Sequence, residues 1–307
     1  MTNFLFYMIT VLIWGSTWLG IKFQLGTVDP ALSVCYRFAL AAMILFVWSF
    51  ARRLPLRFSR GEHFFMALQG VFLFAVNYLF FYLAELQIVS GLAAVVFSTI
   101  VVMNLINGRL FLGTPIEVKV LVGGALGMVG LVLLFWPDMA ATDFSGPVFT
   151  GLLLSFAATY LASLGNILSV RNQRHKLPVV QTNAFGMAYG SACMALVVLA
   201  GGASITIDLT VAYLVSLVYL ALFGSVIAFG CYLSLVGRIG AGRAAYATLL
   251  FPVVALGLST FWEGYTWTLH GVCGIVLILS GNHLAMTRKK ALTEQQSRVR
   301  EAVALDA

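Results

Sequence analysis

The sequence predicts an all-α integral membrane protein whose ten transmembrane helices form two inverted five-helix repeats around a central cavity. Of its 307 residues, 61% are hydrophobic and only 9% are charged, with a mean hydropathy of +0.98. A soluble domain carries roughly 25% charged residues. The apolar runs are about 20 residues long, as a membrane-spanning helix requires, and lack the alternating pattern of a membrane β-barrel. An internal repeat supplies the third observation.

Ten apolar runs follow one another with short connections between them. Each is about long enough to cross the hydrocarbon core of a bilayer as a helix. The N-terminal run lacks a basic leader and a cleavage site, so we expect it to be retained as the first span. The predicted spans are Asn3–Gly20, Ala31–Phe50, Phe64–Ala84, Ser90–Leu110, Val118–Phe135, Phe149–Val170, Val179–Leu199, Val211–Leu235, Gly242–Phe261 and Trp267–Met286.

The two halves of the chain resemble each other at a fixed offset. The segment from Ser90 to Ala94 aligns with the segment from Ala241 to Ala245. The same offset carries three glycines onto three others: Gly113 onto Gly264, Gly123 onto Gly274, and Gly130 onto Gly281. We therefore expect a first repeat over residues 1–138, a second over 146–287, and a polar cytoplasmic tail over 288–307.

The basic residues predict the orientation of the spans. With the N-terminus in the cytoplasm, all of the 18 Lys and Arg residues except Lys22 and Arg37 fall in or beside cytoplasmic segments, as the positive-inside rule requires. Both chain ends are then cytoplasmic. Five spans per repeat is an odd number, so the second repeat enters the membrane from the opposite side. Transporters commonly use such inverted repeats, with a substrate site near the midplane.

Several classes of function lack a signal in this sequence. Cys35, Cys193, Cys231 and Cys273 lie singly within apolar runs, so we expect no disulfide framework, metal site or cofactor. No phosphate-binding GxxxxGK[ST] motif occurs, so the chain has no sign of an ATPase. The net charge of +7 arises from short loops that set orientation, and we expect no nucleic-acid partner. The expected partners are a small-molecule substrate and the lipid bilayer.

The third span carries the richest set of candidate cavity residues: Asn77, Tyr78, Phe81 and Tyr82. Asn77 and Phe81 share one helical face, and Tyr78 and Tyr82 form a neighbouring pair. A cavity for an aromatic or bulky apolar solute requires broad rings and a few polar groups. The alternative is that these rings face lipid or pack against other helices.

Polar and aromatic residues of other spans are further candidates for substrate binding. In membrane helices, Ser and Thr side chains often only bond to their own backbone, which is the alternative for the hydroxyls among them. The candidates are Trp14 and Thr17 in the first span, Ser98 and Thr99 in the fourth, Tyr160, Ser163 and Asn166 in the sixth, Tyr232 in the eighth, and Thr248 and Pro252 in the ninth.

Arg37 is the one clear charge inside a predicted span, and such a residue is a functional candidate by default. We expect a gating or structural ion pair with Glu263, or with Glu85 as the second choice. No Asp, Glu or His lies near the middle of a span, which favours a facilitator, or coupling through a rim group such as Glu263. The uncharged midplane also favours a neutral or zwitterionic solute over a phosphorylated one.

The chain resembles the drug/metabolite transporter superfamily in its ten-span EamA-type branch. The motifs that carry the resemblance are Trp14-Gly15-Ser16 followed by Lys22, Arg37-Phe38 with Ala41-Ala42, and the series Gly224-Ser225, Tyr232, Gly240, Ala244, Ala245, Pro252, Glu263, Gly274 and Gly281. The first repeat departs from this pattern, with Val101 in place of Pro252 and Leu112 in place of Glu263. The second repeat has Ala184 near the place of Arg37.

Within this superfamily, the aromatic content is most similar to the YddG-type bacterial exporters of aromatic amino acids. The resemblance implies a cavity lined mainly by the first, third and fourth spans of each repeat, in the bacterial inner membrane. It implies export of small neutral or zwitterionic metabolites, most of all aromatic or hydrophobic amino acids, by alternating access. Alternatives are an exporter of lipophilic cations, an intramembrane enzyme, or a passive assembly or sensor protein. The sequence leaves the oligomeric state open.

Overall fold

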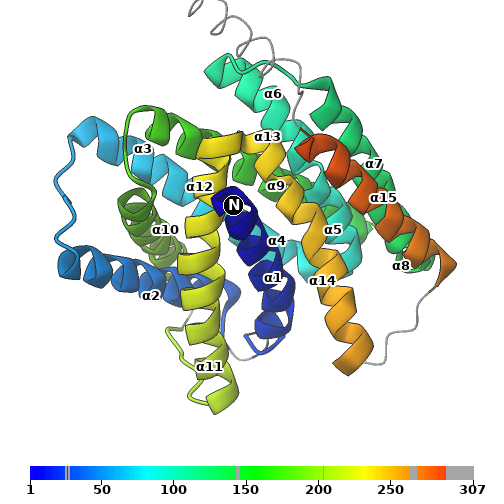
Figure 1. The fold of residues 1–307 in the computed structure, drawn as a ribbon. Coiled ribbons are helices and arrows are strands. Elements are labelled where there is room, and N and C mark those ends of the chain that lie inside the picture. Colours follow the sequence, from blue (N-terminus) through cyan, green and yellow to red (C-terminus); the bar gives the residue numbers. More distant parts are fainter. Residues whose placement is uncertain (25, 27, 143–145, 203, 263–267, 288–307) are drawn as a thin grey trace, which may run out of the picture.

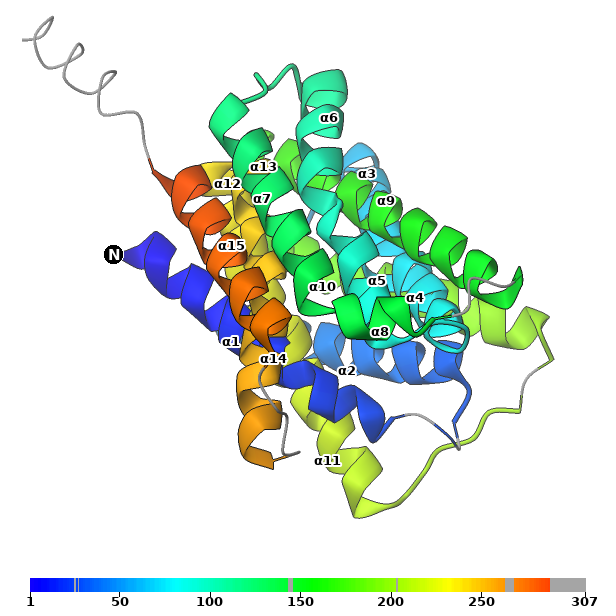
Figure 2. The same ribbon diagram turned by 90° about the vertical axis from the view of Figure 1, so that its right-hand side faces the viewer.

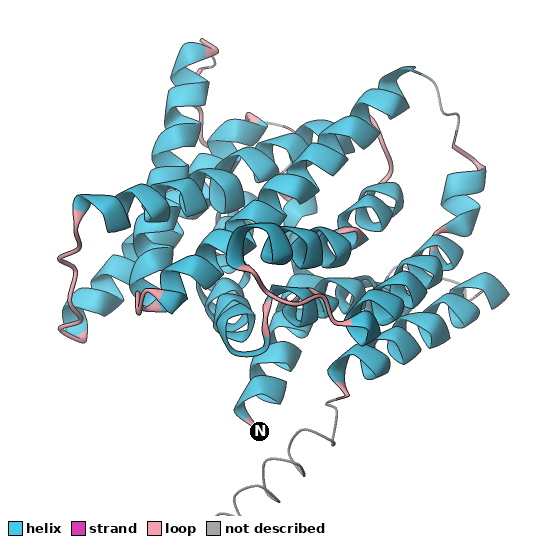
Figure 3. Cartoon of the chain, turned by 90° about the horizontal axis from the view of Figure 1, so that it is seen from above, coloured by secondary structure: helices cyan, strands magenta, loops and turns pink. Residues whose placement is uncertain are grey.

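The elements of the protein are helices joined by short loops (Figure 3). A computed structural model describes residues 1–24, 26, 28–142, 146–202, 204–262 and 268–287. Glu263 and the predicted cytoplasmic tail lie outside these residues. The predicted all-α class is confirmed.

The helices of the first half follow the predicted spans closely. Asp29 begins the second of them, because its Oδ1 accepts a hydrogen bond from the backbone nitrogen of Ala31 at 2.8 Å and Pro30 occupies the first turn. The helices are α1 (Thr2–Lys22), α2 (Pro30–Ala51), α3 (Arg60–Val71), the π-helical η1 (Phe72–Val76), α4 (Asn77–Glu85), α5 (Ser90–Ser98), α6 (Ile100–Leu112), α7 (Val118–Leu134) and the short α8 (Trp136–Ala140).

The helices of the second half have the same order. The eighth predicted span, like the third, contains a π-helical segment. In this segment the Ser225 hydroxyl donates to the Leu220 carbonyl at 3.0 Å. The helices are α9 (Gly146–Arg174), α10 (Val179–Ala200), α11 (Val211–Tyr219), the π-helical η2 (Leu220–Ile227), α12 (Ala228–Ile239), α13 (Ala241–Ala244), α14 (Tyr246–Trp262) and α15 (Leu269–Met286).

Length and composition make these helices membrane-spanning elements. Seven continuous helical stretches have at least 18 residues and are apolar enough to cross a bilayer, and three shorter apolar helices accompany them in the described part of the chain. Each of these stretches overlaps one of the predicted spans. The protein is therefore an all-α, multi-pass membrane protein, while the number of crossings stays a prediction.

Glycines join α7 and α15 in the closest helix pair of the fold (Figure 1). A Cβ atom added to Gly123 would lie 2.5 Å from the carbonyl oxygen of Gly281, and one added to Gly130 would lie 2.6 Å from that of Gly274. The helices therefore run antiparallel. Small residues let membrane helices approach this closely, so the predicted role of these glycines in helix contacts fits the packing.

The remaining helices pack against one another around the centre of the molecule. Helix α2 packs along α10, and α1 packs against both α12 and α14 (Figure 2). Helix α9 packs against α3 and α4 on one side and against α5 and α6 on the other. The long rods thus leave a space between α1, α4, α5, α9, α12 and α14, and this space holds the candidate site.

Candidate functional site: the central cavity

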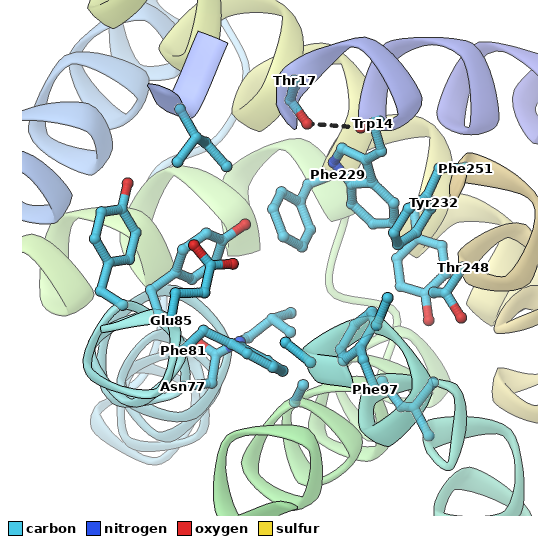
Figure 4. A pocket seen from close by; sticks show the side chains of 18 of the residues that line it. Trp14, Thr17, Asn77, Phe81, Glu85, Phe97, Phe229, Tyr232, Thr248 and Phe251 are labelled. Atoms are coloured by element: carbon cyan, nitrogen blue, oxygen red, sulfur yellow. Dashed lines mark hydrogen bonds between the residues drawn. The ribbon is translucent and has the colours of Figure 1, made fainter. Parts of the chain in front are cut away.

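A cavity of about 150 Å³ lies between the helices at the centre of the protein (Figure 4). Its wall is largely apolar, with a few polar groups, as is typical of small-molecule sites. The lining residues are Trp14, Thr17, Ile21, Arg37, Leu73, Asn77, Tyr78, Phe81, Tyr82, Glu85, Ala93, Ala94, Phe97, Ile100, Ala162, Asn166, Phe229, Tyr232, Thr248 and Phe251.

Trp14 forms the centre of an aromatic wall. Its ring lies 5.0 Å from that of Phe229, 4.9 Å from that of Tyr232 and 6.1 Å from that of Phe251, centroid to centroid. The indole Nε1 donates to the Gly224 carbonyl at 3.1 Å, in the π-helical segment η2, which fixes the ring orientation. Figure 4 shows these rings facing the cavity from three different helices. The wall can therefore pack against a flat apolar group.

Two buried amides leave an oxygen unpaired beside these rings. Asn77 is 5% exposed and Asn166 is 1% exposed, and neither Oδ1 has a hydrogen-bond partner in the described part of the chain. The Asn166 Nδ2 is occupied, because it donates to the Tyr232 hydroxyl at 3.0 Å. An unsatisfied buried acceptor costs about 1–3 kcal/mol. Both oxygens therefore favour a ligand or waters that donate hydrogen bonds.

Arg37 reaches the cavity from α2 with its side chain almost wholly buried. Its Nε donates to the Ser225 hydroxyl at 2.9 Å, and the guanidinium carbon lies 5.1 Å from the Tyr78 ring centroid. Within the described residues, Arg37 forms no ion pair with Glu85, which lines the same cavity near the end of α4. The pairing predicted first, with Glu263, lies outside the described residues.

A second cavity, of about 380 Å³, lies toward the ends of α6, α9 and α12. Asn104 lines it and donates through Nδ2 to the Ala241 carbonyl at 3.1 Å. Its Oδ1 accepts from the Asn166 Nδ2 at 3.5 Å. Asn104, Asn166 and Tyr232 thus form a hydrogen-bonded partition between the two cavities. Arg243 and Glu117, 2.5 Å apart, line the second cavity.

The structure brings most of the predicted substrate-binding residues together around the central cavity. The nine that line it are Trp14, Thr17, Asn77, Tyr78, Phe81, Tyr82, Asn166, Tyr232 and Thr248, together with Arg37 and Glu85 of the predicted ion pair. They come from six separate regions of the sequence, and their role in binding a substrate stays a prediction.

Five predicted residues do not line this cavity. The hydroxyls of Ser98 and Thr99 bond to the carbonyls of Val95 and Val96, as the alternative reading expected. Pro252 is buried within α14. The remaining two lie on α9: Tyr160 is 41% exposed, and Ser163 accepts a hydrogen bond from Asn107 at 2.9 Å.

Sequence reasoning missed several apolar residues of the wall. Phe229 precedes Tyr232 by three positions and Phe251 follows Thr248 by three, so helical spacing from these two chosen residues could have found both. Phe97 pairs in the same way with Ile100, which was not among the predicted residues. In the described part of the chain, no cluster of three or more His, Cys, Asp or Glu side chains could hold a metal ion.

The fold is that of a multi-pass membrane protein whose helices enclose a central cavity. The sequence pattern of the EamA-like transporter family matches residues 1–136 and again residues 149–287. The chain belongs to this family.

Several proteins of similar sequence are named as transporters or efflux pumps. The "Uncharacterized inner membrane transporter YedA" of Escherichia coli K12 is 30% identical over 285 residues, covering 89% of each chain. A "Probable amino-acid metabolite efflux pump" of Salmonella typhimurium is 27% identical, over 90% of this chain and 92% of its own. A crystal structure of a protein with 18% identity superposes with a TM-score of 0.76 over 92% of this chain and 96% of the other, which shows the fold alone.

Proposed function

We propose that this protein exports small neutral or zwitterionic metabolites, most of all aromatic or hydrophobic amino acids, across the bacterial inner membrane. The observation that carries the proposal is the central cavity, which is lined by aromatic rings and by two buried asparagines whose oxygens have no hydrogen-bond partner among the described residues. A cavity of about 150 Å³ accommodates a benzene-sized group. A relative named as an amino-acid metabolite efflux pump supports the same substrate class.

The proposed mechanism is alternating access between two inverted repeats, residues 1–138 and 146–287. The double match of the family pattern supports a repeat. The glycine contacts of α7 and α15 support its inversion, because Gly123 meets the equivalent of Gly130 and Gly130 meets the equivalent of Gly123. Such reciprocal contacts are typical of a two-fold symmetry axis. Because the two helices are antiparallel, the axis is perpendicular to them and therefore lies in the plane of the membrane.

In the proposed orientation both chain ends are cytoplasmic. The central cavity then extends from the partition toward the outer ends of α1 and α4, where Ile21 and Glu85 line it. The second cavity, with Arg174, Arg238 and Arg243 in its wall, is on the cytoplasmic side, as the positive-inside rule favours. The conformation corresponds to an outward-facing state, and the partition must open for a solute to enter from the cytoplasm.

Export of lipophilic cations is the second candidate, because Glu85 places a carboxylate in the cavity wall. A substrate panel in proteoliposomes separates the two candidates. The purified protein is reconstituted, and uptake is measured for phenylalanine, tryptophan, leucine and a quaternary-ammonium dye. We expect saturable flux of the aromatic amino acids that empty liposomes do not show. Flux of the dye alone would favour the second candidate, and flux of no solute would contradict the transport proposal.

A further inference from the structure

We propose that Arg37 binds the carboxylate of the transported solute, while the unpaired oxygens of Asn77 and Asn166 accept hydrogen bonds from its amino group. The cavity would then select α-amino acids over amines and acids that carry only one of these groups. This inference rests on the proposed export of amino acids and assigns each end of the solute to a protein group.

Arg37 is a buried cation, and several N–H donors of its guanidinium have no acceptor among the described residues. Its side chain is 3% exposed, and the one hydrogen bond it donates to a described residue is that from Nε to Ser225 at 2.9 Å. The Nη atoms, which form the fork that matches a carboxylate, have no acceptor among the described residues. The Tyr78 ring, 5.1 Å away, supports the charge but supplies no anion. A carboxylate in the cavity would neutralise this charge.

Glu85 is poorly placed to be that anion. It lies on the same helical rod as Asn77, eight residues further on, or about 12 Å along the helix axis at 1.5 Å per residue. It forms no ion pair with Arg37 among the described residues. The guanidinium and the carboxylate of Glu85 are therefore separate features of the cavity wall, one deep and one near the end of α4.

The two asparagines line the cavity from helices that pack closely against each other. Asn77 adjoins Tyr78, whose ring contacts the guanidinium. Asn166 comes from α9, which touches the third span where an added Cβ on Gly165 would lie 2.7 Å from the Cβ of Leu73, one turn before Asn77. The two asparagines thus lie on neighbouring, closely packed turns, and both side chains face the cavity. An ammonium donates three hydrogen bonds and accepts none, which suits two unpaired oxygens.

The aromatic wall leaves room for the side chain of the solute on the side of the cavity opposite Asn77. Figure 4 shows Asn77 and Glu85 on one side of the cavity and Phe251 and Thr248 on the other. A solute held at its charged end by Arg37 and the amides would lay its side chain against the rings around Trp14. The arrangement explains why a cavity with an arginine is otherwise so apolar.

Competition with three related solutes tests the assignment in the wild-type protein. Uptake of labelled phenylalanine into proteoliposomes is measured against unlabelled phenylalanine, phenylalaninamide, which lacks the carboxylate, and 3-phenylpropionate, which lacks the amino group. We expect both analogues to compete at least about tenfold more weakly, because each loses a charge-assisted hydrogen bond. Equal competition by phenylalaninamide would overturn the role of Arg37.

The Arg37→Gln variant then tests whether Arg37 causes the preference for phenylalanine over phenylalaninamide. We expect it to bind phenylalanine about tenfold more weakly and phenylalaninamide about as well as the wild type, so that the preference disappears. Arg109→Gln is the matched control, because Arg109 is exposed on α6, lines neither cavity and carries the same charge. Equal weakening of both solutes in Arg37→Gln would indicate a structural role and overturn the inference.

The outcomes distinguish a failure of the Arg37 assignment from a failure of the proposed export function. If Arg37→Gln does not yield folded protein, the wild-type competition decides alone. Amino-acid uptake with no discrimination among the analogues contradicts the assignment of Arg37 and the amides but leaves the export function standing. Absence of amino-acid uptake, with flux of the quaternary-ammonium dye, contradicts both.

Discussion

The third span and α9 carry two sets of buried amides, and the two sets differ in how far their hydrogen bonds are satisfied. In one region, Asn172 donates to the Gln69 Oε1 at 2.9 Å, and the Gln69 Nε2 donates to the Asn183 Oδ1 at 3.4 Å. About two turns further along the same helices, Asn77 and Asn166 each keep an oxygen without a partner. The two regions share elements, burial and residue type.

The difference indicates which amides hold the fold and which bind a ligand. A buried polar group is normally paired, and a persistent exception requires an explanation. The Gln69 cluster lies away from both cavities and joins the third span, α9 and α10. Asn77 and Asn166 line the central cavity. We infer that the first cluster contributes stability, whereas the second set contributes to binding a solute.

A second closed cluster lies at the opposite end of the molecule. The Gln24 side chain donates to the Ser216 hydroxyl at 2.9 Å and to the Tyr213 carbonyl at 3.2 Å, and the Tyr213 hydroxyl contacts that of Ser33 at 3.2 Å. It joins the turn after α1 to α2 and α11, as the Gln69 cluster joins α9, α10 and α3. Paired clusters at the two ends, with unpaired amides between them, favour rigid helix groups around a central site.

The largest expected effect comes from removing an unpaired amide, which should weaken binding without weakening the fold. In Asn77→Leu, we expect the affinity for phenylalanine to fall by about 1.5–3 kcal/mol, or tenfold to a hundredfold, because a hydrogen bond to a charged group is lost. The unfolding midpoint should stay the same or rise, because the oxygen has no partner to lose. Uptake kinetics and thermal unfolding in detergent measure both. A lower unfolding midpoint with unchanged affinity for phenylalanine would contradict the distinction between amides that bind the solute and amides that stabilise the fold.

Removing a paired amide should have the opposite effect. In Asn172→Leu, the side chain keeps its approximate volume, but the Gln69 Oε1 loses its donor at 2.9 Å. We expect a loss of about 1–2 kcal/mol in stability, since hydrogen bonds between membrane helices are worth somewhat less than in soluble proteins. The affinity of the folded fraction for phenylalanine should match the wild type. A large change in affinity would show that the Gln69 cluster is linked to the site.

Much of the fold followed from the sequence because the bilayer restricts it to helices of one approximate length. The apolar runs predicted each rod. The repeat offset aligned Gly123 with Gly274 and Gly130 with Gly281, whereas in the structure Gly123 meets Gly281 and Gly130 meets Gly274. The π-helical segments could not be foreseen, because they depend on tertiary contacts such as those of Ser225 with Arg37. The short helix α8 arises in a connection and lacked an apolar signal.

The site was predictable by residue type and less so by orientation. Asn77 was chosen because a buried amide in a membrane helix needs a partner, and Asn166 because it is one of the polar residues of the sixth span. Tyr160 was misplaced because helical periodicity in a uniformly apolar span does not distinguish the face toward the cavity from the face toward lipid. Ser163 lies on the correct helix, but its hydroxyl pairs with Asn107 on α6. Which partner a hydroxyl chooses depends on helix packing that one sequence does not specify.

The smallest expected effect concerns the partition that the Asn166 amide also forms. Tyr232→Phe removes the hydroxyl that accepts from Asn166 at 3.0 Å but keeps the ring 4.9 Å from Trp14, so the cavity wall is preserved. We expect the partition to weaken by about 0.5–1 kcal/mol and a cysteine at Ala162 to react twofold to fivefold faster with an impermeant thiol reagent added from the cytoplasmic side. Tyr36→Phe, whose hydroxyl bonds to the exposed Thr206 carbonyl, is the matched control. An unchanged reaction rate would show that the hydroxyl of Tyr232 does not hold the two cavities apart.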